Sequence, residues 1–334
     1  MEFDANEANA SDVIDERGQS SGGSGLGGLG GSGGGGAGLG LIITLLTSLM
    51  GRGKGGKKSS LGLIVLLVVG VLIFRTCSAG GGFDLGSVLN NLNKLPNSQA
   101  ADGQQLPATG NTIDLANDPQ AADVQFANVV ISDANDVWTE AFRTANKSYT
   151  RTKLVLYTDA VDTGCGSATS SVGPFYCPAD QRVYLDLSFW NELQQRFGAD
   201  GDFAQAYVIA HEVGHHVQQQ LGISAKVSQE ERADPGSANG AAGLSVRTEL
   251  QADCLAGVWA HSRYERGSVQ AGDIDEAINA AKAVGDDTIQ KESVGSVRPD
   301  TFTHGESKQR AKWFKAGFDS GSSDDCDTFS VDEL

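Results

Sequence analysis

The sequence has little positive charge, and this shortage excludes one broad class of partner. Its 25 Lys and Arg residues stand against 42 Asp and Glu residues, which gives a formal net charge of −17 at pH 7. Proteins that bind nucleic acid neutralise phosphates with clustered Lys and Arg side chains. No DNA or RNA partner is therefore expected.

The five cysteines lack the Cys-x-x-Cys spacing that is typical of zinc–thiolate clusters. Cys165 and Cys177 flank a Gly/Ser-rich stretch, and Cys254 and Cys326 remain as a second pair. Four cysteines allow three connectivities, and two disulfides are the natural prediction. Disulfides accumulate outside the cytoplasm, so this part of the chain is expected there. Cys77 is left without a partner.

Side chains that could form a core are scarce in the first part of the chain, where glycine dominates. Residues 21–40 hold 13 of the 44 glycines. Such a stretch cannot offset the backbone entropy that is lost on ordering. We predict that residues 1–58 form a disordered, acidic and Gly-rich cytoplasmic region, which excludes a compact enzyme made of all 334 residues.

Long hydrophobic runs are also few, and the strongest covers residues 61–74. It is shorter than the roughly 20 apolar residues of an ordinary membrane span, but flanking Lys and Arg side chains can reach toward the headgroups. We predict one transmembrane helix over residues 59–76, and disfavour a buried core helix. A second run, residues 39–50, is interrupted by hydroxyl residues and is predicted to be interfacial or disordered. A two-pass hairpin is the less favoured alternative.

The charges around the hydrophobic run predict its orientation. Residues 51–75 contain five basic residues and no acidic one, and four of the five precede the run. Lys and Arg stay on the cytoplasmic side of a span, so the N-terminus is expected in the cytoplasm and the remainder outside it. A cleaved signal peptide would need basic residues near the start, where this chain is acidic.

The remainder of the chain divides into a stalk and a folded domain. Residues 77–127 are rich in Asn, Gln, Gly and Ala, and we predict a flexible stalk. Residues 128–334 are predicted to form a mostly helical α+β domain with a small sheet. The predicted strands cover residues 153–157 and 182–187. One helix is predicted to begin after residue 132, and five more are predicted over residues 188–197, 202–220, 245–265, 273–284 and 306–318.

The helix predicted over residues 202–220 carries the pattern of a metal site. His211 and His215 are four residues apart, so both imidazoles project from one face and can bind one ion. Glu212 is turned by about 100° around the helix, where it can accept a proton without binding the metal. A surface helix with incidental histidines is disfavoured, because the segment is too apolar. His216 is predicted to be solvated or to support the site, and not to be a ligand.

Two histidines leave a catalytic zinc site one protein ligand short. Glu249 is the candidate, and Asp253 lies one helical turn further along. Two buried carboxylates would repel each other unless Glu249 binds zinc and Asp253 accepts the N–H of a ligand histidine. A solvated acidic face is disfavoured by the apolar neighbours. Glu230, Glu231 and His261 are weaker candidates, because they lie in a polar segment or too far along the helix.

The metal-site pattern stands beside three other segments with distinctive sequences. The four are His211-Glu-Val-Gly-His-His-Val-Gln218, Glu249-Leu-Gln-Ala-Asp-Cys254, Cys165-Gly-Ser-Ala with Gly173-Pro-Phe-Tyr-Cys177-Pro-Ala-Asp, and Thr303-His304-Gly305. Together they resemble the bacterial putative neutral zinc metallopeptidase family, over essentially the whole chain. The resemblance implies a zincin-like catalytic domain of gluzincin type, with zinc on His211, His215 and Glu249 and with Glu212 as the base.

A peptidase also needs a hydrogen-bond donor for the charge that develops on the substrate carbonyl. His304 is the first candidate, because similar membrane gluzincins place a histidine-bearing turn in a comparable position, and Tyr264 is the second. Val183–Leu187 is the candidate edge strand for an extended peptide.

The expected protein is a zinc metallopeptidase anchored in the inner membrane by a single pass, with its catalytic domain in the periplasm or otherwise outside the cytoplasm. Its partners are the membrane and a peptide or protein substrate. The alternative is a non-catalytic envelope scaffold or a peptide-binding protein with a structural zinc site. Glu212 argues against that alternative, because a structural site has no use for a carboxylate beside its ligands.

Overall fold

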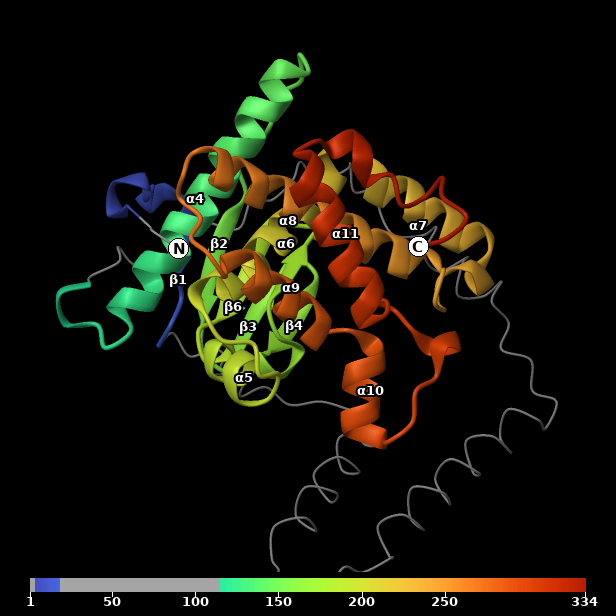
Figure 1. The fold of residues 1–334 in the computed structure, drawn as a ribbon. Coiled ribbons are helices and arrows are strands. Elements are labelled where there is room, and N and C mark those ends of the chain that lie inside the picture. The colour runs from blue at the N-terminus through green and yellow to red at the C-terminus, as the bar shows by residue number, and fades with distance from the viewer. Residues whose placement is uncertain (1–3, 19–114) are drawn as a thin grey trace, which may run out of the picture. The chain divides into compact units, whose positions relative to one another are not determined.

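A computed structural model describes residues 4–18 and 115–334, which form one unit (Figure 1). Within these residues no helix is both long enough and apolar enough to cross a bilayer. The predicted transmembrane helix at 59–76, the second hydrophobic run at 39–50 and Cys77 lie outside the described residues.

The described residues contain a four-stranded sheet in the order β1-β2-β6-β5. The strands β1 (Val13–Asp15), β2 (Lys153–Tyr157) and β6 (Arg182–Asp186) run parallel, and β5 (Phe175–Cys177) is antiparallel to β6. A separate hairpin consists of β3 (Ala160–Thr163) and β4 (Gly166–Thr169). The predicted strand at 153–157 is confirmed, and the one at 182–187 is one residue shorter than predicted.

Side chains alternate between the two faces of the sheet, as the two-residue period of a strand requires. Leu154 and Leu156 join the main core, whereas Val155 and Tyr157 join a smaller cluster with Val161 of the hairpin. Both faces are covered, which explains why β2 and β6 are buried along nearly their whole length.

Helix α4 (Ala121–Thr144) packs against this core through apolar residues spaced three or four apart, among them Val124, Ile131 and Trp138. The prediction that a helix begins only after residue 132 was wrong, and the last part of the predicted stalk, residues 115–127, is ordered. Ser132 and Asp133 looked like helix caps, but they lie inside the helix. There the Asp133 carboxylate accepts hydrogen bonds from Trp259 and Arg266.

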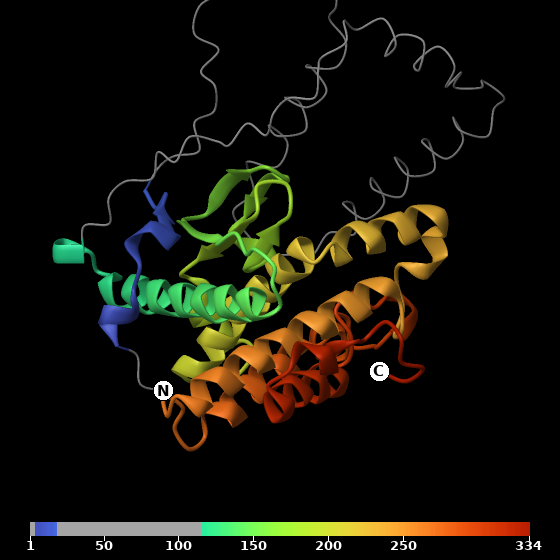
Figure 2. The ribbon, with the colours of Figure 1, turned by 90° about the horizontal axis from the view of Figure 1, so that it is seen from above.

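The C-terminal half is helical and contains every helix predicted there, with ends that match to within two residues. The long helices are α6 (Asp202–Gln220), α8 (Leu244–Glu265) and α11 (Ser307–Ser320), and the shorter ones are α5 (Phe189–Gln195), α7 (Ile223–Ala233), α9 (Asp273–Ala283) and α10 (Asp286–Val294). Figures 1 and 2 show α11 lying along α8. A Cβ atom on Gly257 would lie 2.1 Å from the Phe314 carbonyl oxygen, so this close packing requires glycine.

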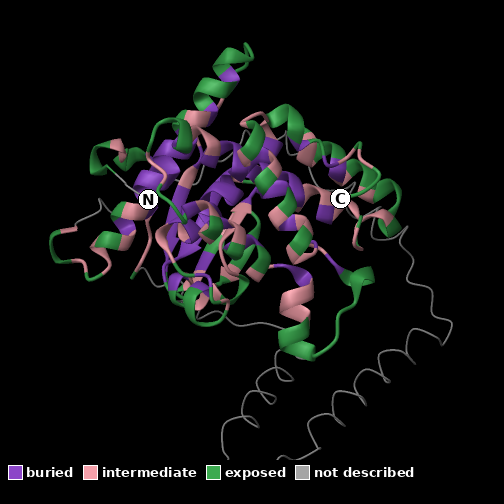
Figure 3. Cartoon of the chain, in the orientation of Figure 1, coloured by how far each residue is buried: buried purple, intermediate pink, exposed green. Residues whose placement is uncertain are grey.

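Both predicted disulfides are present, Cys165–Cys177 beside the hairpin and Cys254–Cys326 between α8 and the C-terminal segment. Figure 3 shows the buried residues concentrated in the sheet and in the inner faces of the long helices.

The segment 4–18 differs from the prediction that residues 1–58 are disordered. It forms two short 3-10 helices, η1 (Ala5–Glu7) and η2 (Ala10–Asp12), followed by β1. Figure 2 shows this segment, in blue, running across α4. The composition of the whole N-terminal region is that of a disordered chain, but Val13 and Ile14 are buried because the edge of β2 accepts them.

We expect Ile14→Ala to lower the free energy of unfolding by about 2 kcal/mol, because it removes a buried aliphatic side chain. Ile14 is 5% exposed and packs in the smaller cluster with Val155 and Tyr157. Chemical denaturation of the full chain measures the change, with Ser11→Ala at a neighbouring exposed position as the control. An unchanged stability in Ile14→Ala would mean that β1 does not pack on the sheet in solution.

Candidate active site

Helix α6 places His211 and His215 side by side. The helix begins directly after Gly201. The negative charge of Asp202 in its first turn interacts favourably with the positive end of the helix dipole and so stabilises the helix. Its covered face buries Phe203, Tyr207 and Val213, which fixes the rotation of the helix. The two imidazole ring centres are 4.8 Å apart, as residues one turn apart on one face should be.

Helix α8 brings Glu249 to these two rings. One carboxylate oxygen lies 3.3 Å from His211 Nε2, and the other lies 3.4 Å from His215 Nε2. One ligand atom from each of the three residues lies within 4.8 Å of the others, a spacing that suits a single metal ion. The structure thus brings together the three residues predicted as ligands. Glu230, Glu231 and His261 are not part of this group.

The approach of α8 to α6 depends on Gly214. A Cβ atom at this position would lie 2.9 Å from the Ala252 carbonyl oxygen and 3.1 Å from the Ala252 Cα. Contacts this short require the helices to move apart. Glycine therefore sets the distance between the element that carries the histidines and the element that carries Glu249.

We expect Gly214→Ala to destabilise the protein by about 1–3 kcal/mol, the usual cost of overpacking, and to weaken metal binding. The added methyl group would push α8 and Glu249 away from α6. Thermal unfolding and a zinc-affinity titration measure the two effects. The matched control is Gln219→Ala, in the last turn of the same helix. Normal zinc affinity in Gly214→Ala would show that the helix spacing does not limit the site.

The outer nitrogens of both histidines are held by acceptors, which orients the inner nitrogens. His211 Nδ1 lies 2.9 Å from Asp253 Oδ1, and His215 Nδ1 lies 2.9 Å from Gln218 Oε1. An Nδ1–H that donates to an acceptor leaves Nε2 as the ligand atom, an arrangement typical of metal-binding histidines. Two imidazole nitrogens and one carboxylate therefore fit the protein ligands of a catalytic zinc site.

Asp253 is fully buried within a hydrogen-bonded network. Arg310 donates to both of its oxygens, from Nε at 2.8 Å and from Nη2 at 2.9 Å, and the Tyr207 hydroxyl donates at 2.5 Å. The sequence predicted the role of Asp253 beside a ligand histidine. It did not indicate Arg310 or Tyr207 as members of this network.

These charges set the protonation of the metal-free site. Burial disfavours a charged His211, but Asp253 and Glu249 outweigh burial and raise its pKa to about 10. Burial would likewise raise the pKa of Glu249, yet the two histidines hold it well below its usual range. The site is therefore a compact set of opposite charges.

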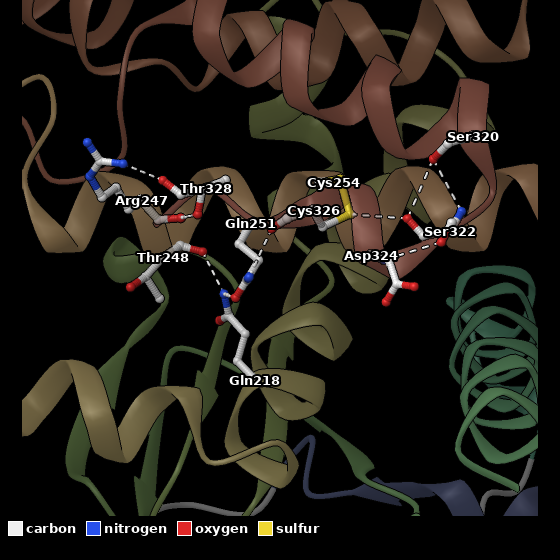
Figure 4. The surroundings of a disulfide bond; sticks show 10 residues. All are labelled: Gln218, Arg247, Thr248, Gln251, Cys254, Ser320, Ser322, Asp324, Cys326 and Thr328. Atoms are coloured by element: carbon white, nitrogen blue, oxygen red, sulfur yellow. Dashed lines mark hydrogen bonds between the residues drawn. A yellow bond between two sulfur atoms is a disulfide. The ribbon is translucent and has the colours of Figure 1, made fainter. Parts of the chain in front are cut away.

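Gln218, which contacts His215, is connected through hydrogen bonds to the Cys254–Cys326 disulfide (Figure 4). Its amide nitrogen donates to Gln251 Oε1 at 3.0 Å, and Gln251 in turn donates to the Cys326 carbonyl oxygen at 2.9 Å. The disulfide is therefore linked to Glu249 through α8, which carries Cys254, and to His215 through Gln251 and Gln218.

His216 is buried and is not a member of the metal-site group. Its Nε2 lies 2.7 Å from the Thr150 carbonyl oxygen, and the Tyr176 hydroxyl lies 3.0 Å from Nδ1. The prediction of a solvated histidine was wrong, and the alternative of a supporting residue fits. His216 links α6 to β5 through Tyr176.

Glu212 and His304 line one cavity together with the three candidate ligands. The cavity has a volume of about 600 Å³ and is bordered on other sides by Phe175, Phe189 and Phe197. Tyr264, the second candidate donor, is 56% exposed and packs against Phe318 outside this cavity.

Asp286 holds the turn that carries His304. One of its carboxylate oxygens accepts hydrogen bonds from the backbone N–H groups of Thr303, His304 and Gly305. The other lies 3.3 Å from His304 Nδ1, and this contact raises the pKa of His304. Asp286 was not predicted from the sequence, although its position directly after Gly285 at the start of α10 was a usable signal.

The prediction that Val183–Leu187 forms an edge strand was wrong. Residues 183–187 belong largely to β6, which is paired on both sides by β2 and β5. The outer strand on the side of the cavity is β5, and Phe175 and Tyr176 line that cavity. The near-continuous apolar residues of this segment are typical of a central strand and not of an edge strand.

The chain is similar to one described family and to proteins of two bacterial species. Residues 47–329 match the family described as "Putative neutral zinc metallopeptidase". "Uncharacterized protein YpfJ" of Escherichia coli K12 is 46% identical over 279 residues, which cover 83% of this chain and 87% of that protein. "Uncharacterized protein Rv2575" of Mycobacterium tuberculosis H37Rv is 47% identical over 197 residues, which cover 56% of this chain and 65% of that protein. No solved structure matches the chain.

Proposed function

Because the chain belongs to the putative neutral zinc metallopeptidase family, we propose that it is a zinc-dependent peptidase that hydrolyses peptide bonds. The observation that carries the proposal is the position of Glu212. A structural metal site needs ligands alone, whereas here a carboxylate that is not one of the three ligands faces the same cavity.

His211, His215 and Glu249 would hold the zinc ion, with Asp253 and Gln218 fixing the two imidazoles. When bound, zinc supplies Lewis acidity that makes a water molecule more acidic and polarises a peptide carbonyl.

The carboxylate of Glu212 accepts the proton of the attacking water and returns it to the leaving nitrogen. The His304 ring donates a hydrogen bond to the carbonyl oxygen as negative charge develops there. Asp286 favours the protonated, donating form of this ring. An extended substrate would lie along β5, where main-chain hydrogen bonds can add it to the sheet.

We place the catalytic domain outside the cytoplasm, attached to the inner membrane. The two disulfides support this location, because such bonds persist in oxidising compartments.

The test is a comparison of newly formed protein termini in cells that carry the wild-type chain or Glu212→Gln. Termini that appear only with the wild type would identify substrates and cleavage preference. Identical termini in both strains, with the zinc-loaded wild type also unable to cut a peptide library, would favour the alternative of a non-catalytic scaffold or peptide-binding protein.

Zinc binding is expected to release at least one proton at pH 7. The pKa of His211 is about 10 in the metal-free protein, so its ring is protonated at this pH and must lose a proton to bind a metal. Zinc affinity should therefore rise with pH up to about 10. Calorimetry in buffers of different ionisation enthalpy counts the protons. Asp253→Asn, which removes the main charge that favours the protonated ring, should release fewer.

A further inference from the structure

The segment 4–18 is an integral part of the catalytic domain. β1 pairs in parallel with β2, with Val13 opposite Leu154, Ile14 opposite Val155 and Asp15 opposite Leu156. The backbone N–H of Glu16 also donates to the Leu156 carbonyl oxygen at 2.8 Å, one residue beyond the ladder. The sheet that supports the metal-site helices thus begins with residues from the start of the chain.

Charged contacts hold the same segment at three separate places. Glu7 accepts a hydrogen bond of 2.7 Å from Arg263 of α8, whose side chain is completely buried. The Asp12 carboxylate, 4% exposed, pairs with Arg151. Arg17 pairs with Asp118, at the start of the second described range.

A single membrane crossing between residues 18 and 115 is incompatible with these contacts. It would leave residues 4–18 on one side of the membrane and residues 115–334 on the other, whereas strand pairing requires them to meet. We infer that both ranges lie in the same compartment, and that the intervening residues cross the membrane twice rather than once. The inference rests on the proposed membrane attachment and replaces the single crossing predicted from the sequence.

The charge pattern of the intervening sequence agrees with a paired crossing. Residues 18–51 contain no charged residue and include the hydrophobic run 39–50, and residues 59–74 contain none and include the run 61–74. Four basic residues lie between these stretches, in 52–58, and residues 4–17 contain five acids against one base. Lys and Arg are retained in short cytoplasmic loops. A topology in which residues 52–58 form a basic cytoplasmic loop and the acidic residues 4–17 lie outside the cytoplasm satisfies that rule.

Cysteine labelling of the full chain in spheroplasts tests the inference. In a Cys77→Ser background, three variants each add one cysteine, by Ser11→Cys, Gly55→Cys or Ser320→Cys. Ser11 and Ser320 are exposed in the folded protein, so these two changes should not disturb it. A membrane-impermeant maleimide is applied before and after lysis, and the background without an added cysteine measures labelling of the native ones.

The variants at positions 11 and 320 are expected to react before lysis, and the variant at position 55 only after it. Opposite behaviour at positions 11 and 320 would overturn the shared compartment. The same behaviour at all three positions would overturn the paired crossing. Reaction before lysis at position 55 alone would support the paired crossing but overturn the location outside the cytoplasm. None of these outcomes depends on peptidase activity, so failure of the proposed function is seen separately.

Discussion

Replacing Glu212 by Gln is expected to reduce peptide hydrolysis by about 10²- to 10⁴-fold, the contribution of a positioned general base. An amide has nearly the same size as the carboxylate but cannot accept the proton of the attacking water. Glu212 lines the cavity beside the ligand group without being one of its three members. The zinc content of the variant should therefore equal that of the wild type.

Metal analysis and peptide turnover, measured on the same preparation, test this prediction. Glu192→Gln is the matched control, because Glu192 lines the same cavity but lies on α5, away from the metal-site helices. Equal loss of turnover in both variants would indicate a general effect of charge in the cavity. Loss of zinc together with turnover in Glu212→Gln would make Glu212 a ligand and remove it as the base.

Replacing Glu249 by Ala is expected to abolish stable zinc binding. The carboxylate lies within 3.4 Å of both inner imidazole nitrogens and offers one oxygen to each side of the site. Its removal also leaves two histidines facing each other without the negative charge that holds them. The loss in affinity should exceed the roughly 10- to 100-fold change that follows removal of a hydrogen-bond partner of a ligand.

Asp253→Asn and Gln218→Leu provide that comparison, since each removes or weakens a single contact to an outer imidazole nitrogen. Both should bind zinc more weakly than the wild type but more tightly than Glu249→Ala. Glu231→Ala is the control outside the metal-site group. Wild-type zinc affinity in Glu249→Ala would exclude it as the third ligand.

The metal-site helices were predictable because their signals are local. The helix at 202–220 has an acidic first residue, a continuous apolar face and histidines one turn apart, and α6 has the same bounds. The strand at 153–157 was equally clear from its branched and apolar residues. In both segments one period repeats without interruption, so neighbouring residues suffice to assign the element.

Other elements depend on partners that a sequence does not display. The helices α7 and α10 are polar, and each buries one residue, Val227 or Asp286. β1 has only three residues and is stabilised as a strand by its pairing with the edge of β2. An element this short shows no repeating pattern of apolar and polar residues from which it could be assigned.

The same limit applies to the residues around the ligands. Asp253 could be predicted because it lies one turn from Glu249 on the same helix. Arg310 reaches Asp253 from α11, and nothing in its own segment distinguishes it from an ordinary polar residue. Tertiary packing alone brings it to the site. Gln218, by contrast, lies on α6 three residues after His215, so its contact with that ring is local.

The pairing of β1 with β2 also affects the order in which the chain folds. Asp12 and Arg151, which pair beside these strands, are 139 residues apart in the sequence. Closing so long a loop costs more entropy than forming a helix or a hairpin, and contacts between distant residues slow folding. β1 is therefore synthesised long before β2 and cannot pair until β2 has been made, and until β1 docks this edge of β2 remains open to pairing with other chains.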